Sequence, residues 1–234
     1  MLSSYPFQKG PFMPDITRVS RFGFVNCYLV REDDGLTLVD AMIPGSAKAI
    51  QAAAAKLGAP IVRIALTHAH TDHIGSLDAL HALLPDAEVL ISSRDARLLA
   101  KDLTLDPDEP QTKLRGGLPG ATTKPTRTIE DGELVGSLQV IATPGHTPGH
   151  VSFLDPRSNT LICGDAFSTL GGVATSAKGT WKFPLPATAT WHKPTEMESA
   201  KKLLTLNPDH LAPGHGKIVD SPTTAMAAAI ERGA

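Results

Sequence analysis

The alternation of apolar and polar residues along the chain predicts mixed α and β structure. Apolar, β-rich runs bounded by turn signals predict strands, and they cover residues 24–30, 36–40, 61–66, 88–92, 136–143, 151–154 and 160–163, with a short strand before Pro213. Apolar residues spaced three and four apart predict helices, at residues 46–57, 77–84, 196–204 and 223–230, and a short helix ends at residues 96–100. Helices interspersed among groups of strands indicate an α/β fold.

Two stretches, residues 102–125 and 167–194, contain too many glycine and proline residues for regular elements, so we predict irregular loops there. No repeat, linker or block of charge divides the chain. We therefore expect residues 1–234 to form a single domain.

Composition narrows the possible partners. The chain has 234 residues, 41% of them hydrophobic, which is enough for a sizeable core. Its net charge of -2 creates no field that would attract nucleic acid. No apolar run is long enough for a membrane span, and the first residues lack the apolar core of a secretory signal. We expect a cytoplasmic monomer or homodimer that acts on a small molecule, without nucleic acid or membrane partners.

The two cysteines, Cys27 and Cys163, are too few for a disulfide framework in a chain of this length. Two reduced, buried thiols are the favoured interpretation, although a single bridge stays open.

The strongest chemical signal is the segment Thr-His-Ala-His-Thr-Asp-His-Ile-Gly at residues 67–75. His68 and His70 lie two apart at the end of a predicted strand, so both rings face the same side and can share one metal ion. Asp72 and His73 fall where a helix begins and can turn toward a neighbouring ion. Imidazole combined with carboxylate suits zinc, manganese or iron, whereas calcium and magnesium prefer oxygen ligands.

Further candidate ligands each follow a glycine at a strand end or turn: His146, Asp165 and His215. Glycine lets the backbone turn sharply and lets a metal-bearing cavity approach the chain closely. The other histidines are interpreted as structural or surface residues, and they are His81, His150, His192 and His210.

The motifs THAHTDHIG, PGHTPGH, CGDAF and APGHG occur in this order over most of the chain, which therefore resembles the metallo-β-lactamase superfamily. The resemblance implies a four-layer αββα sandwich with the site at one edge of two facing sheets. It also implies the ligand sets: His68, His70 and His146 for the first metal, Asp72, His73 and His215 for the second, and Asp165 bridging both. Asp40 and Thr67 are expected behind the ligands, where Asp40 orients the H-x-H loop through hydrogen bonds.

Two adjacent divalent ions, with Zn²⁺ favoured and Fe or Mn as alternatives, would hold a bridging hydroxide as the nucleophile. Asp72 and Asp165 are the expected catalytic residues, and Asp72 would orient the hydroxide and take up its proton. The expected reaction is hydrolysis of a small ester, thioester, lactone or amide such as a β-lactam. Phosphodiester hydrolysis, persulfide oxidation at a single iron and metal binding without turnover remain open alternatives.

Departures from known branches of the superfamily narrow the resemblance. The commonest β-lactamases of the superfamily have cysteine where this chain has Asp165, and the best-known lactonases have tyrosine where it has Ser168. Few residues follow His215, where glyoxalase II carries a helical region that holds glutathione. The remaining group is that of small, stand-alone hydrolases similar to glyoxalase II and the lactonases.

Residues 167–194 directly follow Asp165 and are expected to line the active site. Aromatic side chains beside a metal centre suit a substrate with an apolar portion, and the candidates are Phe167, Trp181, Phe183 and Trp191. The alternative is that the two tryptophans only pin a long loop to the core.

Overall fold

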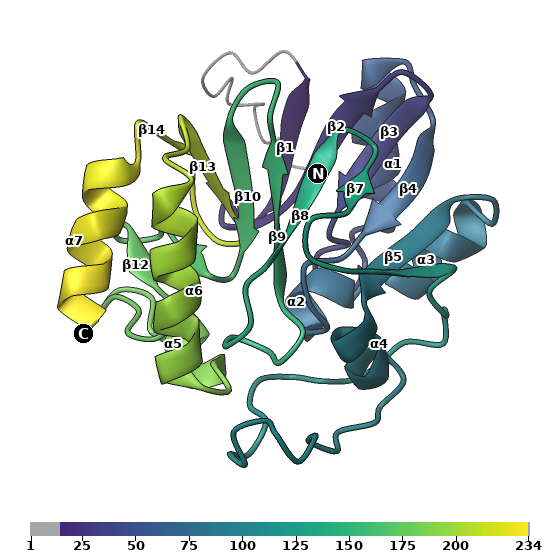
Figure 1. The fold of residues 1–234 in the computed structure, drawn as a ribbon. Helices are drawn as coiled ribbons and strands as arrows, with labels where there is room; N and C mark the ends of the chain where they lie inside the picture. Colours follow the sequence, from purple (N-terminus) through teal and green to yellow (C-terminus); the bar gives the residue numbers. More distant parts are fainter. Residues whose placement is uncertain (1–14, 234) are drawn as a thin grey trace.

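The computed structural model describes residues 15–233, which contain two six-stranded sheets with helices on their outer faces (Figure 1). The first sheet has the order β1-β2-β3-β4-β5-β6. Its strands are β1 (Ile16–Arg21), β2 (Val25–Glu32), β3 (Gly35–Val39), β4 (Ile61–Ala65), β5 (Glu88–Ser92) and β6 (Arg127–Ile129). The second sheet has the order β14-β13-β10-β9-β8-β7. Its strands are β7 (Leu134–Val135), β8 (Leu138–Ala142), β9 (Val151–Asp155), β10 (Thr160–Gly164), β13 (His210–Pro213) and β14 (Val219–Asp220).

The first four helices along the chain lie with the first sheet, and the last three lie with the second. With the first sheet lie α1 (Ala47–Leu57), α2 (Thr71–Ile74), α3 (Leu77–Leu83) and α4 (Ser93–Leu99), and with the second lie α5 (Leu185–Ala189), α6 (Lys193–Thr205) and α7 (Thr223–Gly233). In Figure 1, α6 and α7 cover one side of the molecule and α1 and α3 the opposite side. A small third sheet pairs β11 (Phe167–Ser168) with β12 (Ala174–Thr175).

Strand β2 shows how the sequence builds these layers. Its side chains alternate between two faces: Cys27 and Leu29 pack in the core under α1, α3 and α4, whereas Tyr28 and Val30 pack between the two sheets. A third core joins the second sheet to α6 and α7. Three cores between four layers make an αββα sandwich, so the predicted fold is confirmed.

The directions of the strands place the candidate ligand residues at one edge of the two sheets. Strands β3, β4 and β5 are parallel, so Asp40 after β3 and the 67–75 segment after β4 lie at the same end of the first sheet. In the second sheet β10 pairs parallel with β13 and antiparallel with β9, which is itself antiparallel to β8. The ends of β8, β10 and β13, which precede His146, Asp165 and His215, therefore meet at one edge as well.

The predicted strands and helices all have counterparts, and residues 88–92 match β5. Helix α1 ends at Gly58, whose φ of 70° is the left-handed conformation expected of a C-terminal glycine. The prediction of irregular structure over residues 167–194 was incomplete, because β11, β12 and α5 lie there. Strands of two or three residues and a helix of five are too short for a periodic pattern, and β6, β7 and β14 were missed for the same reason. The six-residue strand β1 was also not predicted.

Within residues 15–233, none of the helices has the length and apolar character needed to cross a membrane. Cys27 and Cys163 are both free and buried, and burial raises the pKa of each thiol.

Candidate metal centre

The predicted ligand side chains converge at the shared edge of the two sheets. Three groups have ligand atoms within 4.8 Å of one another: His68 with His70 and His146, His68 with His73 and Asp165, and Asp72 with His73 and His215. Two of these groups are the ligand sets that the resemblance implies. Strand ends and turns hold the side chains, so their positions follow from the topology of the sheets.

Asp165 lies between the two halves of the cluster. One carboxylate oxygen, Oδ1, is 3.2 Å from His73 Nε2. The other, Oδ2, is 3.5 Å from His146 Nε2 and 3.2 Å from His215 Nε2. The carboxylate therefore faces ligands of both expected metals, as a bridging ligand must.

Hydrogen bonds on the outer side of the rings determine which nitrogen is free to bind a metal. His73 Nδ1 faces Asp40 Oδ2 at 2.8 Å, and His70 Nε2 faces the backbone oxygen of Arg115 at 2.9 Å. Because these oxygens only accept, the facing nitrogens carry the hydrogens. His70 Nδ1 is then left with a lone pair directed into the cluster. Burial lowers the pKa of His73, but the carboxylates of Asp40 and Asp165 outweigh it and raise the pKa, so a metal ion would displace a proton from His73 Nε2.

The same reasoning applies to His146, whose Nδ1 lies 2.9 Å from Thr190 Oγ1. That hydroxyl is within hydrogen-bond distance of the backbone oxygens of Ser176 and Pro186, to which it donates, so it accepts from His146 Nδ1. His146 Nε2 then faces His70 Nδ1 at 3.0 Å, and two lone pairs at this distance are compatible when a cation binds both.

Unpartnered atoms provide a test of whether the residues fit metal ions. His68 Nε2, His73 Nε2 and Asp165 Oδ1 are buried without a hydrogen-bond partner among the described residues. Leaving a buried polar atom unpaired costs about 1–3 kcal/mol. Neighbouring atoms of this kind on imidazole and carboxylate groups form a donor set suited to zinc, iron or manganese, so the cluster fits divalent metal ions.

Electrostatics agree with this assignment. Burial lowers the pKa of His68, His70 and His146, so these rings are neutral, which is the form that binds metals. On the other side, burial lowers the pKa of His215, yet the carboxylates of Asp165 and Asp72 outweigh it and raise the pKa to about 9. An excess of carboxylate charge at this position attracts cations.

Asp40 and Thr67 lie behind the ligands. Asp40 Oδ1 accepts a hydrogen bond from the backbone N–H of Thr67 at 2.8 Å, and Oδ2 accepts one from its hydroxyl at 2.9 Å. Asp40 also contacts His73, so one carboxylate connects the end of β3 to both ends of the H-x-H-x-D-H segment. The backbone φ of Asp40 is 65°, a left-handed conformation that few residue types adopt.

The glycines beside the ligands are required by close contacts. A Cβ atom on Gly214 would lie 2.4 Å from Asp165 Oδ1, and one on Gly145 would lie 2.2 Å from the backbone nitrogen of Glu196. The prediction that these positions need glycine for close approach thus has a direct steric reason.

Sequence reasoning missed several residues that hold the ligands. Arg115 and Thr190 reach the cluster from loops distant in the sequence, and no local pattern marks them. Asp95, at the start of α4, accepts hydrogen bonds from the backbone N–H groups of Ala69 and Gly149. It was overlooked because a single acidic residue early in a helix is common.

A cavity of about 330 Å³ opens over the cluster. His70, Asp72, His146, Asp165 and His215 form its floor, and its walls include Phe22, Phe24, Ile43, Phe183, Leu185 and Pro186. The walls are thus mostly apolar and aromatic. No lysine or arginine lines this cavity among the described residues.

The aromatic residues expected in the pocket have different positions. Phe183 lines the cavity, and its ring centroid is 5.2 Å from that of His215. Phe167 instead packs in the core under α6 and α7, and Trp181 is 87% exposed beside Lys182, outside the cavity. Trp191 is buried and donates from Nε1 to the backbone oxygen of Thr112, so it ties two loops together, as in the alternative interpretation. Trp181, Phe183 and Trp191 lie outside the named helices and strands, so the tertiary packing of this segment decides their orientations.

Comparisons with known proteins agree with the geometry. A family model described as the metallo-β-lactamase superfamily matches residues 20–215. The chain is 52% identical over 209 residues to the uncharacterized protein YobT of Bacillus subtilis, covering 89% of this chain and 90% of that protein. It is 32% identical to the probable metallo-hydrolase YflN of the same organism, covering 82% and 80%.

A hydroxyacylglutathione hydrolase of Gloeobacter violaceus is 30% identical over 159 residues, which are 66% of this chain and 54% of that protein. Among solved structures, TTHA1623 in a di-iron-bound form has a TM-score of 0.63 at 26% identity, covering 90% of this chain and 96% of that one. A β-lactamase from Chitinophaga pinensis shares the fold, with a TM-score of 0.65 at 20% identity, covering 93% and 88%. The family match across the ligand motifs shows that the chain belongs to the metallo-β-lactamase superfamily and is a hydrolase.

Proposed function

We propose that this protein hydrolyses small carbonyl substrates, namely esters, thioesters, lactones or amides, at a centre of two divalent metal ions, with zinc as the first candidate. The observation that carries the proposal is the convergence of imidazole nitrogens in the cluster, with hydrogen bonds on the outer side of His70, His73 and His146 fixing which nitrogen faces inward. Such ligands are oriented before a metal arrives.

Two ions are favoured over one because the ligand atoms form separate groups. His68, His70 and His146 surround one position, and Asp72, His73 and His215 surround another. Asp165 contacts both groups. A single ion at the first position would leave His73 Nε2 buried and without a hydrogen-bond partner.

The residues then have distinct roles. The chemistry that the metal ions would supply is activation of a water molecule as the nucleophile and polarisation of the substrate carbonyl. Asp72 lines the cavity, and its side chain is 36% exposed, so it can accept a proton from that water. Although burial acts to raise the pKa of Asp72, its hydrogen bond from His215 lowers it, so the carboxylate is ionised at neutral pH. Phe24 and Phe183 form an apolar wall for the part of the substrate next to the carbonyl.

The lining also bears on the choice between carbonyl and phosphoryl substrates. A phosphodiester carries a negative charge at the reacting group, and enzymes commonly stabilise it with lysine or arginine. The cavity over the cluster has no such side chain among the described residues. A neutral carbonyl group is therefore the favoured reacting group.

Metal analysis combined with a substrate panel tests the proposal. The protein is purified without chelators, its metals are quantified by elemental mass spectrometry, and hydrolysis of a p-nitrophenyl ester, a lactone, a thioester and bis-p-nitrophenyl phosphate is measured. We expect about two ions per chain, hydrolysis of at least one carbonyl substrate, loss of activity on chelation and recovery on refilling. Asp72→Asn removes a carboxylate ligand and is assayed with excess metal; we expect it to lose most of the turnover even when two ions per chain are restored.

Other outcomes would assign a different chemistry. Preferential hydrolysis of the phosphodiester would move the protein to the competing class. One iron per chain with oxygen uptake on a persulfide would replace hydrolysis by oxidation. Two bound metals with no turnover of any substrate would overturn the enzymatic proposal.

A further inference from the structure

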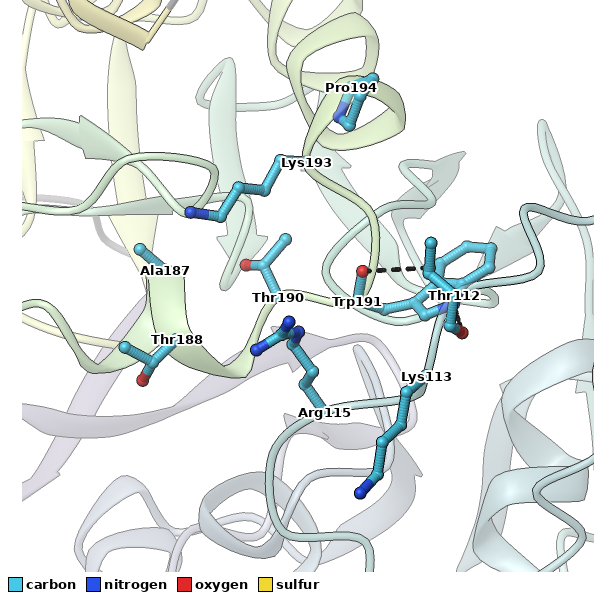
Figure 2. A pocket seen from close by; sticks show the side chains of 9 residues that line it. All are labelled: Thr112, Lys113, Arg115, Ala187, Thr188, Thr190, Trp191, Lys193 and Pro194. Atoms are coloured by element: carbon cyan, nitrogen blue, oxygen red, sulfur yellow. Dashed lines mark hydrogen bonds between the residues drawn. The ribbon is translucent and has the colours of Figure 1, made fainter.

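Figure 2 shows the lining of a second cavity, of about 420 Å³. Its lining comes from the loop before β6, from α5 and from the start of α6, and comprises Thr112, Lys113, Arg115, Ala187, Thr188, Thr190, Trp191, Lys193 and Pro194. The metal ligands and the apolar cavity above them do not explain what this second cavity does.

The charge of this lining is entirely positive. Lys113, Arg115 and Lys193 all line the cavity, and no acidic residue does. Among residues 15–233, none of these three side chains makes an ion pair or a side-chain hydrogen bond. Unneutralised cations gathered in a concave site attract an anion, and this is unexpected in a chain whose net charge is -2.

The remaining lining suits a ligand with a polar head and a carbon stem. The hydroxyls of Thr112 and Thr188 donate to the backbone oxygens of Trp191 and Leu185. Arg115 is therefore the main hydrogen-bond donor for an anion, because its guanidinium can donate two parallel hydrogen bonds to one carboxylate or phosphate. Trp191 and Pro194 provide an apolar surface beside them.

The two cavities are neighbours that share no lining residue, and the same short segments form the wall between them. Arg115 contributes its side chain to the second cavity and its backbone oxygen to His70, while the following Gly116 lines the cavity over the metal cluster. Thr190 likewise lines the second cavity and contacts His146. Helix α5 divides its residues between the two, with Ala187 and Thr188 on one side and Pro186 and Ala189 on the other.

We propose that the cationic cavity binds an anionic group of the substrate, a carboxylate or a phosphate, remote from the carbonyl that reacts at the metal centre. This inference rests on the proposed function and specifies its substrate class: esters, thioesters, lactones or amides that carry a distant acidic group. The neutral reacting group occupies the apolar cavity, and the acidic end lies among Lys113, Arg115 and Lys193.

Matched substrates test the preference. Hydrolysis of p-nitrophenyl butyrate is compared with hydrolysis of the p-nitrophenyl monoester of glutarate, which ends in a carboxylate, and of an otherwise equal ester that ends in a phosphate. We expect the KM of one acidic ester to be about tenfold lower than that of the neutral ester, and the better of the two identifies the anion. Equal KM values for all three esters would overturn the inference while leaving the proposed function intact.

Variants connect that preference to the cavity. In the double variant Lys113→Met and Lys193→Met, the KM advantage of the acidic ester should disappear, and 0.5 M salt should weaken the advantage in the wild type. The matched control is Lys182→Met, which removes an exposed lysine that lines neither cavity and should leave all constants unchanged. A double variant that keeps the full preference would contradict the assignment.

A binding measurement keeps the inference testable if no ester is hydrolysed, an outcome that would count against the proposed function alone. Glutarate and inorganic phosphate are titrated into the metal-loaded protein by calorimetry, with the double variant in parallel. Binding of one anion that weakens about tenfold or more in the double variant supports the cavity. Equal binding by wild type and double variant would overturn it.

Discussion

His150 accepts a hydrogen bond at Nε2 from the backbone N–H of Asp165 over 3.1 Å, so a histidine outside the ligand set holds the residue that bridges both halves of the cluster. The other nitrogen, Nδ1, lies 2.8 Å from Thr143 Oγ1. Burial lowers the pKa of His150 to about 3, so the ring stays neutral and Nε2 stays an acceptor. The expectation that His150 is structural agrees with this contact, although its contact with Asp165 could not be foreseen.

Replacing His150 should therefore weaken the metal centre without removing a ligand. In His150→Ala the N–H of Asp165 loses its partner inside the protein, which costs about 1–3 kcal/mol of the free energy of unfolding. Metal content after dialysis and thermal unfolding are the measurements. His210→Ala is the control, because His210 pairs with Asp220 on the surface. Equal metal retention in both variants would show that His150 does not position Asp165.

Asp40→Asn should lower metal affinity while preserving the backbone. Asparagine tolerates the left-handed conformation at this position, but its amide group can accept only part of the hydrogen bonds from Thr67 and His73. Loss of such an outer hydrogen bond costs roughly 10–100-fold in metal affinity. Competition against a chromogenic chelator measures the effect, and an unchanged affinity would remove Asp40 from the support of the ligands.

Gly116→Ala should disturb His70 by contact alone. A Cβ atom at Gly116 would lie 2.4 Å from His70 Nε2, and the φ of Gly116 is 79°. The matched control is Gly132→Ala, because Gly132 has a φ of 83° and nothing within 4 Å of its Cβ position. Both variants should lose about 1–2 kcal/mol of stability from backbone strain. Only Gly116→Ala should also lose metal affinity. If both variants lost metal affinity equally, backbone strain and not contact with His70 would be the cause.

Asp95 should couple the two loops that carry His68, His70 and His146. Its Oδ2 accepts from the N–H of Ala69 at 3.0 Å and from the hydroxyl of Thr147 at 2.8 Å, while Oδ1 accepts from the N–H of Gly149 at 2.8 Å. In Asp95→Asn an amide NH₂ must face one of these donors.

We expect Asp95→Asn to lower the free energy of unfolding by about 1–3 kcal/mol and to reduce metal retention, as measured by denaturant titration and elemental analysis. Thr147→Ala removes a single donor and should have a smaller effect, about 1 kcal/mol. Asp86→Asn, at an exposed position between α3 and β5, is the control and should change neither quantity. If Asp95→Asn matched the control, the two loops would be held together by other contacts.

Much of the architecture was predictable because its signals are local. The apolar, β-rich runs of β2 and β3 record burial on both faces, and the spacing in α1 records burial on one face; both are properties of neighbouring residues. The short elements β11, β12 and α5 were not predictable, because too few residues carry a period and contacts with distant segments stabilise them.

The sequence by itself determined the metal-binding chemistry. The spacing of the H-x-H-x-D-H segment and the glycines before His146, Asp165 and His215 specify ligand type and local geometry, and the structure brings all of these side chains together. Only the tertiary structure decided how they are held and what lies beside them. The contacts from Arg115, Thr190, Asp95 and His150, the outward position of Trp181 and the cationic cavity all depend on segments that are distant in the chain. Short-range spacing contains no information about which distant segments meet, because packing of the two sheets and their helices sets those contacts.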